Sequence, residues 1–274
     1  MLTLLATPIG NLEDLSLRAI RTLKEADLIL CEDTRRTKIL LKHIESEQVP
    51  CWSYHTWNEN SQLEPVLKQL REGKNLVLVS DAGTPLISDP GFELVRAVVQ
   101  EGLKIDAIPG PCAPIVALLL SGLPCSRFQF IGFLPKTAGE RKALFAECLE
   151  YPGTSICFES PHRIEKSVEE LTALAPDHKL ALARELTKIH QECIQGTSSE
   201  LLLHIQQHPP RGELVLLIGP GTPAKLSIEE ATKQVVALYR TGTSLSDATR
   251  EVADMSGLRK KQLYQAALEV LALN

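Results

Sequence analysis

The stretch KNLVLVSDAGTPLISDPGFELVRAVVQEG (residues 74–102) contains the pattern that decides the fold. The run Leu76–Ser80 is typical of a buried strand, and the amphipathic run Phe92–Glu101 is typical of a helix that ends before Gly102. Two aspartates, two prolines and two glycines lie between them, at residues 80–91. A strand-to-helix connection needs only about two to six residues. This longer, stiff and acidic connection is therefore expected to do more than join two elements.

The same alternation of short apolar runs and helical patterns continues outward from this stretch, and it predicts an N-terminal α/β domain at 1–121. Strands separated by helices favour a parallel or mixed sheet with helices on both faces. The predicted strands are Leu2–Ala6, Leu28–Cys31, Pro50–Tyr54, Leu76–Ser80 and Lys104–Ile108, and the predicted helices are Ser16–Ala26, Thr37–His43, Ser61–Glu72, Phe92–Glu101 and Pro114–Ser121.

A second α/β domain is predicted at 122–222, after the break GLPCSR. Its strands Phe128–Gly132, Thr154–Glu159, Leu180–Glu185, Glu192–Gly196 and Glu213–Ile218 accompany helices Gly139–Glu150, Arg163–Ala175 and Ser198–His208. Two of these strands follow each other directly, which favours a mixed sheet. The remainder, 223–274, is predicted to be a helical appendage with helices Ser227–Arg240, Ser246–Met255 and Arg259–Leu271, which resemble a helix-turn-helix bundle.

Composition excludes several classes of protein. The chain has 274 residues, 44% of them apolar, and a net charge of −5, which argues against a uniformly basic nucleic-acid coat. Its seven cysteines and seven histidines show no metal-ligand spacing, so no metal is expected, and reduced thiols indicate a cytoplasmic protein. The first apolar run ends after six residues, and no run approaches the length of a membrane span.

The turns after the strands are the candidate ligand contacts, because ligands of open α/β sheets bind beyond the carboxyl ends of the strands. These turns contain neither a GxxxxGK[ST] phosphate loop nor a three-glycine dinucleotide fingerprint. The carboxylates of Asp81 and Asp89 disfavour a polyphosphate and favour a cation or ribose hydroxyls. Gly83 and Gly110 would allow close approach of the backbone to a ligand. S-adenosylmethionine, with a sulfonium, an amino group, a ribose and no phosphate, has the matching properties.

Seven motifs now make a family resemblance specific. ATPIGNLEDLSLRAI, CEDTRRT, SDAGTPLISDPG, PGPCAP, GFLPK, FESPHR and ARELTKIHQE occur in this order over roughly residues 3 to 218. The sequence resembles the ribosomal RNA small subunit methyltransferase I family, within the tetrapyrrole methylase superfamily, and the tail 225–274 resembles that family's helical domain. The resemblance implies two tetrapyrrole methylase-like α/β domains with S-adenosylmethionine in the cleft between them, a homodimer, and 2′-O-methylation of a cytidine in 16S rRNA of the small ribosomal subunit.

Matching these motifs residue by residue implies a set of cofactor contacts. They are Pro8, Asp81, Gly83, Thr84, Ile87, Ser88, Cys112, Ala113 and Phe158. Thr84 stands where the wider superfamily has aspartate, which is the form expected of the rRNA branch. Cys112 stands where the family more often has serine. Because a thiol is the weaker hydrogen-bond partner, a backbone contact is the firmer expectation at that position.

Methyl transfer to a 2′-hydroxyl requires an in-line arrangement and help with the hydroxyl proton. Glu159 and Glu185 are candidate proton acceptors, and Lys188 and Arg184 are candidates to stabilise an alkoxide. Each has a structural alternative. Glu159 is also suited to capping the helix that follows it, and Arg184 and Glu185 are also suited to a structural ion pair.

RNA contacts are expected from basic residues beside the cleft. Arg35 and Arg36 fall in a predicted post-strand turn, and His162 and Arg163 fall in the ESPHR turn. Two other functions remain open at this point: a methyltransferase acting on a small tetrapyrrole, and a non-enzymatic RNA-binding assembly factor with the same fold.

Overall fold

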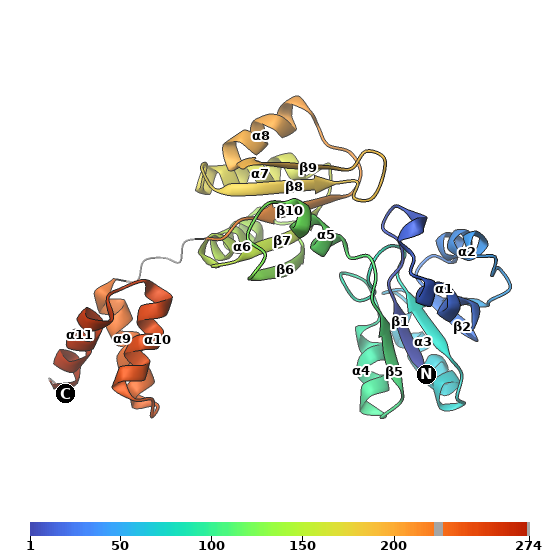
Figure 1. Cartoon of the computed structure of the whole chain (residues 1–274), viewed down its shortest axis with the longest axis horizontal. Coiled ribbons are helices and arrows are strands. Elements are labelled where there is room, and N and C mark those ends of the chain that lie inside the picture. Colours follow the sequence, from blue (N-terminus) through green and yellow to red (C-terminus); the bar gives the residue numbers. More distant parts are fainter. Residues whose placement is uncertain (222–226, 273–274) are drawn as a thin grey trace.

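The computed structural model describes residues 1–221 and 227–272, so the boundary predicted between 222 and 223 lies outside the described residues. The described chain forms two α/β units and a helical unit (Figure 1). This arrangement confirms the fold class that the sequence predicted.

The first sheet is parallel throughout, with the strand order β3-β2-β4-β1-β5. Its strands are β1 (Leu2–Leu5), β2 (Leu28–Cys31), β3 (Cys51–Ser53), β4 (Leu76–Val79) and β5 (Ile105–Ile108), and its helices are η1 (Leu12–Asp14), α1 (Leu17–Lys24), α2 (Thr34–His43), α3 (Glu59–Arg71) and α4 (Phe92–Gln100). Alternate side chains of the strands pack with α1 and α2 on one face and with α3 and α4 on the other. All five strands therefore present their carboxyl ends at one edge of the sheet.

The second sheet is mixed, with the strand order β6-β7-β10-β8-β9. Only the β6–β7 pair is parallel. Its strands are β6 (Phe128–Phe133), β7 (Thr154–Glu159), β8 (Lys179–Arg184), β9 (Glu192–Thr197) and β10 (Leu214–Ile218), and its helices are α6 (Ala138–Glu150), α7 (Ile164–Leu174) and α8 (Ser198–Gln207). These three helices cover one face of the sheet with the largest apolar cluster of this unit.

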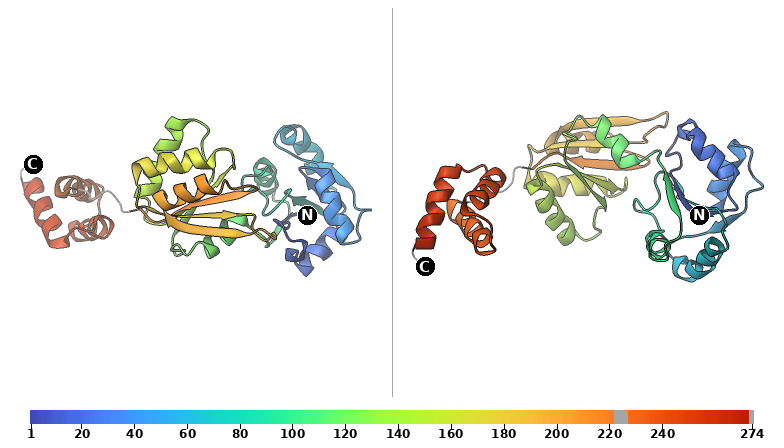
Figure 2. Two further views of the ribbon diagram at one scale, coloured as in Figure 1. Left: turned by 90° about the horizontal axis from the view of Figure 1, so that it is seen from above. Right: turned by 60° about the horizontal axis from the view of Figure 1, so that its bottom comes forward.

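Helix α5 (Ala113–Leu120) follows the first sheet in the chain but packs against the second. Ala117 and Leu118 join the apolar cluster on the face opposite α6 and α7, and both further views show α5 on that side (Figure 2). Gln195 Nε2 on β9 donates to the carbonyl of Leu120 at 3.0 Å. The sequence placed this helix in the first domain. Its packing differs from that expectation because the second sheet has an apolar face that α6–α8 leave uncovered.

The helices α9 (Ile228–Arg240), α10 (Leu245–Ser256) and α11 (Lys260–Ala272) pack on one another around a small apolar core. Ser227 starts α9 with a reciprocal capping box to Glu230, and Ser244 caps α10. Within the described ranges, no helix is long and apolar enough to cross a membrane.

Candidate active site

The connection between β4 and α4 folds back onto the neighbouring turns. Thr7 and Gly83 exchange backbone hydrogen bonds at 2.9 and 3.0 Å as an isolated antiparallel bridge. The Oγ of Ser80 donates to the carbonyl of Gly83 at 3.0 Å, and the Oγ1 of Thr84 donates to the carbonyl of Pro111 at 2.9 Å. The turns after β1, β4 and β5 are thereby joined into one wall at the carboxyl edge of the first sheet.

This wall requires an unusual backbone. Gly83, Leu86, Ser88 and Gly91 all have positive φ, at 85°, 70°, 67° and 120°. Non-glycine residues rarely occupy this region, and they persist there only where the surroundings enforce it. A Cβ at Gly83 would lie 3.2 Å from Cγ2 of Ile9, a tight contact that adds to the preference for glycine at this φ. Both features favour a connection shaped for a ligand over a simple helix entry.

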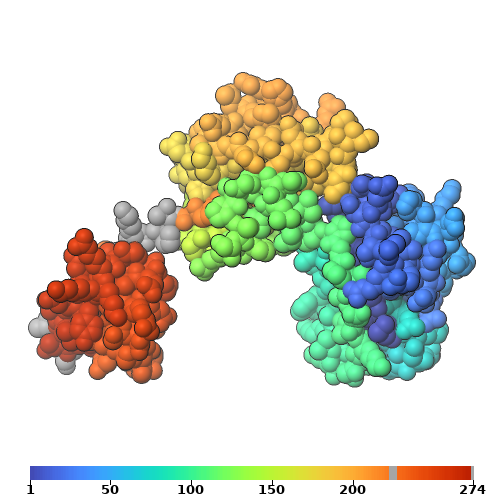
Figure 3. Space-filling view, viewed as in Figure 1, coloured from blue at the N-terminus to red at the C-terminus, as the bar shows by residue number. Residues whose placement is uncertain are grey.

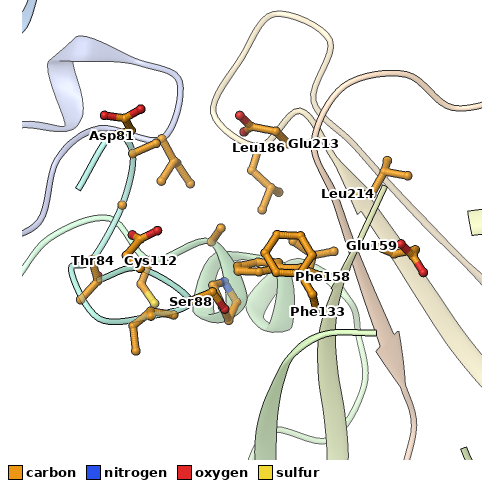
Figure 4. A pocket seen from close by; sticks show the side chains of 18 of the residues that line it. Asp81, Thr84, Ser88, Cys112, Phe133, Phe158, Glu159, Leu186, Glu213 and Leu214 are labelled. Atoms are coloured by element: carbon orange, nitrogen blue, oxygen red, sulfur yellow. The ribbon is translucent and has the colours of Figure 1, made fainter. Parts of the chain in front are cut away.

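A cavity of about 400 Å³ opens between this wall and the second unit. Asp81, Thr84, Ser88 and Cys112 lie on one side of it, and Phe133, Phe158, Leu186 and Leu214 lie on the other (Figure 4). The rings of Phe133 and Phe158 are 5.3 Å apart, centroid to centroid. The cavity thus has a polar, acidic side and an apolar, aromatic side, and its volume is in the range of small-molecule sites.

The cavity brings together most of the predicted cofactor contacts. Its lining includes Asp81, Gly83, Thr84, Ile87, Ser88, Cys112, Ala113 and Phe158, and also Glu159, which was predicted to act in catalysis. Pro8 does not belong to the lining, so the cavity gives the prediction at that position no support. The neighbouring Ile9 faces the cavity instead, because the bridge of Thr7 to Gly83 sets the direction of the TPIGN turn.

Sequence reasoning missed several lining residues on other segments. Glu32, Ile9, Phe133, Leu186 and Glu213 all face the cavity. Glu32, Phe133 and Leu186 belong to motifs that had been singled out, so their strand-end positions could have indicated them. Glu213 precedes β10, and no local pattern distinguishes it.

Three carboxylates gather at the acidic side. Burial, together with the charges of Glu32 and Asp81, raises the pKa of Asp89 to about 7. Burial also raises the pKa of Glu32, with the charge of Asp81 as the next cause. Asp81 is better partnered, because it accepts from the backbone N–H of Asp33 at 2.9 Å and lies 3.7 Å from Nε of Arg36. This side of the cavity is accordingly a site with surplus negative charge, suited to a cation.

Glu159, a predicted proton acceptor, is held by several partners at the start of α7. Its carboxylate pairs with the guanidinium of Arg163 at 2.6 Å and accepts from Ser167 Oγ at 2.9 Å and from the backbone N–H of Ser160 at 2.6 Å. The side chain is fully buried and directed away from the cavity (Figure 4). Arg163 also donates to the carbonyl of Leu134. These contacts fix the start of α7, and they favour a structural role for Glu159 and Arg163 over the predicted roles of proton acceptor and phosphate contact.

Glu185 and Lys188 form an ion pair of 2.9 Å, and Lys188 Nζ also lies 3.3 Å from Glu213. The hydrogen bond from Lys188, followed by that from the backbone of Glu213, lowers the pKa of Glu185. Burial lowers the pKa of Lys188, but its two carboxylate partners outweigh burial, so the net shift is upward. At neutral pH the pair is a carboxylate and an ammonium. The lowered pKa makes Glu185 a weaker proton acceptor, and Lys188 keeps its positive charge.

The loop that carries this pair lies against the first turn of the chain. The backbone N–H of Asn11 donates to Thr187 Oγ1 at 3.1 Å, and a Cβ at Gly10 would lie only 2.5 Å from Cγ of Lys188. In the space-filling view the blue N-terminal segment abuts the second unit (Figure 3). Lys188 is not itself a lining residue, but Leu186 and Glu213 beside it are.

The predicted RNA contacts lie outside the cavity. Arg35 and Arg36 occupy the first turn of α2, because Asp33 caps the helix and starts it three residues earlier than the sequence suggested. Their placement in a turn was therefore wrong, although both still lie at the carboxyl edge of the first sheet. His162 is exposed next to the lining residue Pro161.

Fold and cavity together define the class of the protein. Residues 1–202 match the family model of tetrapyrrole (corrin/porphyrin) methylases. Solved structures with the same fold include a diphthine synthase, with a TM-score of 0.62, 15% identity and coverage of 81% of this chain and 91% of that one. Another is the uroporphyrin-III C-methyltransferase of Thermus thermophilus complexed with S-adenosylhomocysteine, with a TM-score of 0.55, 18% identity and coverage of 80% and 96%.

The relatives narrow this class. Residues 227–270 match the C-terminal helix-turn-helix domain model of ribosomal RNA small subunit methyltransferase I. Proteins with that name from Synechocystis sp. and from Halalkalibacterium halodurans are 40% and 39% identical to this chain. The first alignment covers 99% of this chain and 99% of the Synechocystis protein. The second covers 96% of this chain and 93% of the Halalkalibacterium protein. The chain belongs to the ribosomal RNA small subunit methyltransferase I family of methyltransferases.

Proposed function

We propose that this protein transfers a methyl group from S-adenosylmethionine to the ribose 2′-hydroxyl of a cytidine in 16S rRNA of the small ribosomal subunit. The observation that carries the proposal is the cavity between the two units, which joins an acidic side to an aromatic one without a phosphate loop. The names of the relatives supply the substrate class. A cytoplasmic homodimer, with rRNA as partner, completes the proposal.

The residues of the cavity fit S-adenosylmethionine. Phe158, Leu186 and Val215 offer an apolar surface for an adenine ring. Asp81 and Asp89 offer acceptors to a ribose diol or an amino group, and they suit a ligand with net positive charge. Cys112 and Ala113 lie where the chain enters α5, so backbone contacts are available whatever the thiol does. When bound, the cofactor supplies a methyl group activated by the positive sulfonium.

The protein's own contribution to catalysis is chiefly positioning and electrostatics. The turn of residues 80–91 is locked by the Thr7–Gly83 bridge and the Thr84–Pro111 hydrogen bond, so it forms a fixed wall against which a ligand can be aligned. Lys188, oriented by two carboxylates, places its ammonium group beside the lining residues Leu186 and Glu213. There it stabilises negative charge that develops on an attacking hydroxyl oxygen.

The direct test is methyl transfer from labelled S-adenosylmethionine. The protein is incubated with undermethylated small subunits, with naked 16S rRNA and with a porphyrinoid, and the labelled nucleotide is mapped. Label on one cytidine ribose is the expected result. Label on the porphyrinoid alone would favour the tetrapyrrole alternative, and tight cofactor binding with no labelled product would favour the non-enzymatic one.

Lys188→Ala is expected to lower kcat by about 100-fold while changing the Kd for S-adenosylmethionine less than three-fold. The reason is that the lysine charge acts on the transition state, and one such group is worth roughly 10²–10³ in rate. Lys166→Ala, at an exposed position of α7, is the matched control and should be neutral. Unchanged turnover in Lys188→Ala would remove the lysine from the mechanism.

Asp89→Asn is expected to weaken S-adenosylmethionine binding at pH 8 about ten-fold while stabilising the free protein. The folded-state pKa, about 7, is above the ordinary value of 3.8, so the folded protein holds the extra proton and its stability falls as pH rises from about 4 to 7. A pKa shift of this size corresponds to a change of about 4 kcal/mol in the free energy of unfolding. Because Asp89 is partly exposed, we expect about 1 kcal/mol.

Calorimetry and thermal unfolding between pH 5 and 8 check both effects. The variant should lose the pH dependence of its stability in this window. S-adenosylhomocysteine, which lacks the sulfonium charge, should lose less affinity than S-adenosylmethionine does. Equal losses for both ligands would show that Asp89 acts through shape and not through charge.

A further inference from the structure

Trp57 is 94% exposed, although tryptophan is among the side chains that gain most from burial. It lies in the connection from β3 to α3, just beyond the carboxyl end of β3. The strand order β3-β2-β4 places this connection next to the one after β2, which in turn adjoins the 80–91 wall of the cavity. Trp57 is therefore at the same edge of the sheet as the proposed active site.

The exposed ring is displayed on an ordered turn. The backbone N–H of Tyr54 donates to the carbonyl of Cys31 at 2.8 Å, which anchors the start of the turn to β2. Asn58 closes it, since its Oδ1 accepts from the N–H of His55 at 2.8 Å and its Nδ2 donates to the carbonyl of Ser53 at 2.9 Å. Glu59 then accepts from the N–H of Gly91 at 3.3 Å. The turn is thus tied both to β2 and to the last residue of the cavity wall.

The neighbouring connection, which follows β2, leads into the basic helix α2. The exposed cations of α2 are Arg35, Arg36, Lys38 and Lys42, and the helix contains no acidic residue. Arg36 connects this surface to the cavity through its 3.7 Å approach to Asp81. Arg35 is 89% exposed and is oriented by a bidentate pair with Asp33. In the order of the strands β4, β2 and β3, the connections at this edge carry Asp81, then the two arginines, then Trp57.

We propose that Trp57, Arg35 and Arg36 form a docking strip for a single-stranded segment of the RNA substrate, with one base stacked on Trp57. Cations that follow a backbone, combined with an exposed aromatic face, are the features with which proteins bind single strands. The strip rests on the proposed function and extends it, because it states how the nucleotides flanking the target are held. The rest of the RNA is oriented by phosphate contacts with α2.

The test compares Trp57→Ala and Trp57→Phe for binding of isolated small subunits and of a single-stranded oligoribonucleotide. Trp57→Ala should weaken RNA binding about ten-fold, as expected for the loss of one stacked base, whereas Trp57→Phe should stay within about three-fold. The Kd for S-adenosylmethionine should not change in either variant. Val99→Ala, an exposed apolar position near the other end of α4, is the matched control and should be neutral.

Arg35 and Arg36 are tested by salt dependence. Arg35→Ala combined with Arg36→Ala should reduce the slope of log Kd against log salt concentration by about one to two. Two results would overturn the proposal. In the first, Trp57→Ala binds RNA with wild-type affinity. In the second, Trp57→Ala loses affinity for small subunits but not for the oligoribonucleotide. The second result would indicate that Trp57 contacts a ribosomal protein and not the RNA. Because the readout is binding, these outcomes are distinct from a failure of methyl transfer, which would overturn the proposed function instead.

Discussion

Replacement of Glu159 by glutamine is expected to lower the free energy of unfolding by about 2–4 kcal/mol. The carboxylate is fully buried and has three hydrogen-bonding partners, of which Arg163 is charged and only partly exposed. A neutral amide leaves that guanidinium without its counter-charge and presents an N–H₂ group to donors. Thermal unfolding should show a decrease of roughly 5–10 °C in the Tm.

The control is Glu192→Gln, which breaks the more exposed ion pair of Glu192 with Arg184 and should cost at most about 1 kcal/mol. Well below its unfolding temperature, Glu159→Gln should retain methyl transfer within a few-fold. A variant with normal stability and no turnover would restore Glu159 as a proton acceptor and contradict the structural role given to it here.

Gly83→Ala is expected to weaken S-adenosylmethionine binding by at least ten-fold. The φ of Gly83 is 85°, and a Cβ there would lie 3.2 Å from Ile9 Cγ2, so the added methyl group must displace the Thr7–Gly83 bridge or the Ile9 side chain. Either movement changes the cavity lining. The measurement is cofactor affinity by calorimetry, together with thermal stability.

Gly73→Ala is a closely matched control. Gly73 follows α3 with a φ of 86°, and nothing lies within 4 Å of a Cβ placed on it. Both substitutions therefore add the same backbone strain, about 1 kcal/mol, but only Gly83→Ala crowds the site. If both variants bind S-adenosylmethionine equally well, the wall at residues 80–91 does not contact the cofactor closely.

Local pattern predicted most elements of the fold. The strands β2 and β7 were predicted with their observed bounds, because apolar runs ended by polar residues are unambiguous at that length. The start of α2 was misplaced by three residues, since Asp33 was not taken as its cap. Helix α5 was recognised, yet its partner was not, because an apolar helix carries no information about which of two sheets will bury it.

The residues of the candidate site also fall into those that local sequence predicted and those that only their partners in the fold explain. The turn at 80–91 was identified by its acidity and stiffness, and the cavity includes seven of its residues, Asp81, Ala82, Gly83, Thr84, Ile87, Ser88 and Asp89. Glu159, Arg163 and Glu185 have chemistry that suits catalysis or RNA binding, so composition favoured them. Their partners, which lie elsewhere in the chain or across a helix turn, instead hold them in ion pairs.

The sequence by itself determined the order of strands and helices, the absence of a phosphate loop, and a connection whose prolines, glycines and carboxylates suit a cationic ligand. These are local properties, set by side-chain period, backbone preference and charge. Only the tertiary structure decided which carboxylates face the cavity, that α5 belongs with the second sheet, and that the connection of Trp57 follows the strand next to that of the α2 arginines. These spatial relations depend on the order of strands in the sheets and on the direction of side chains, which bring residues far apart in the chain next to each other.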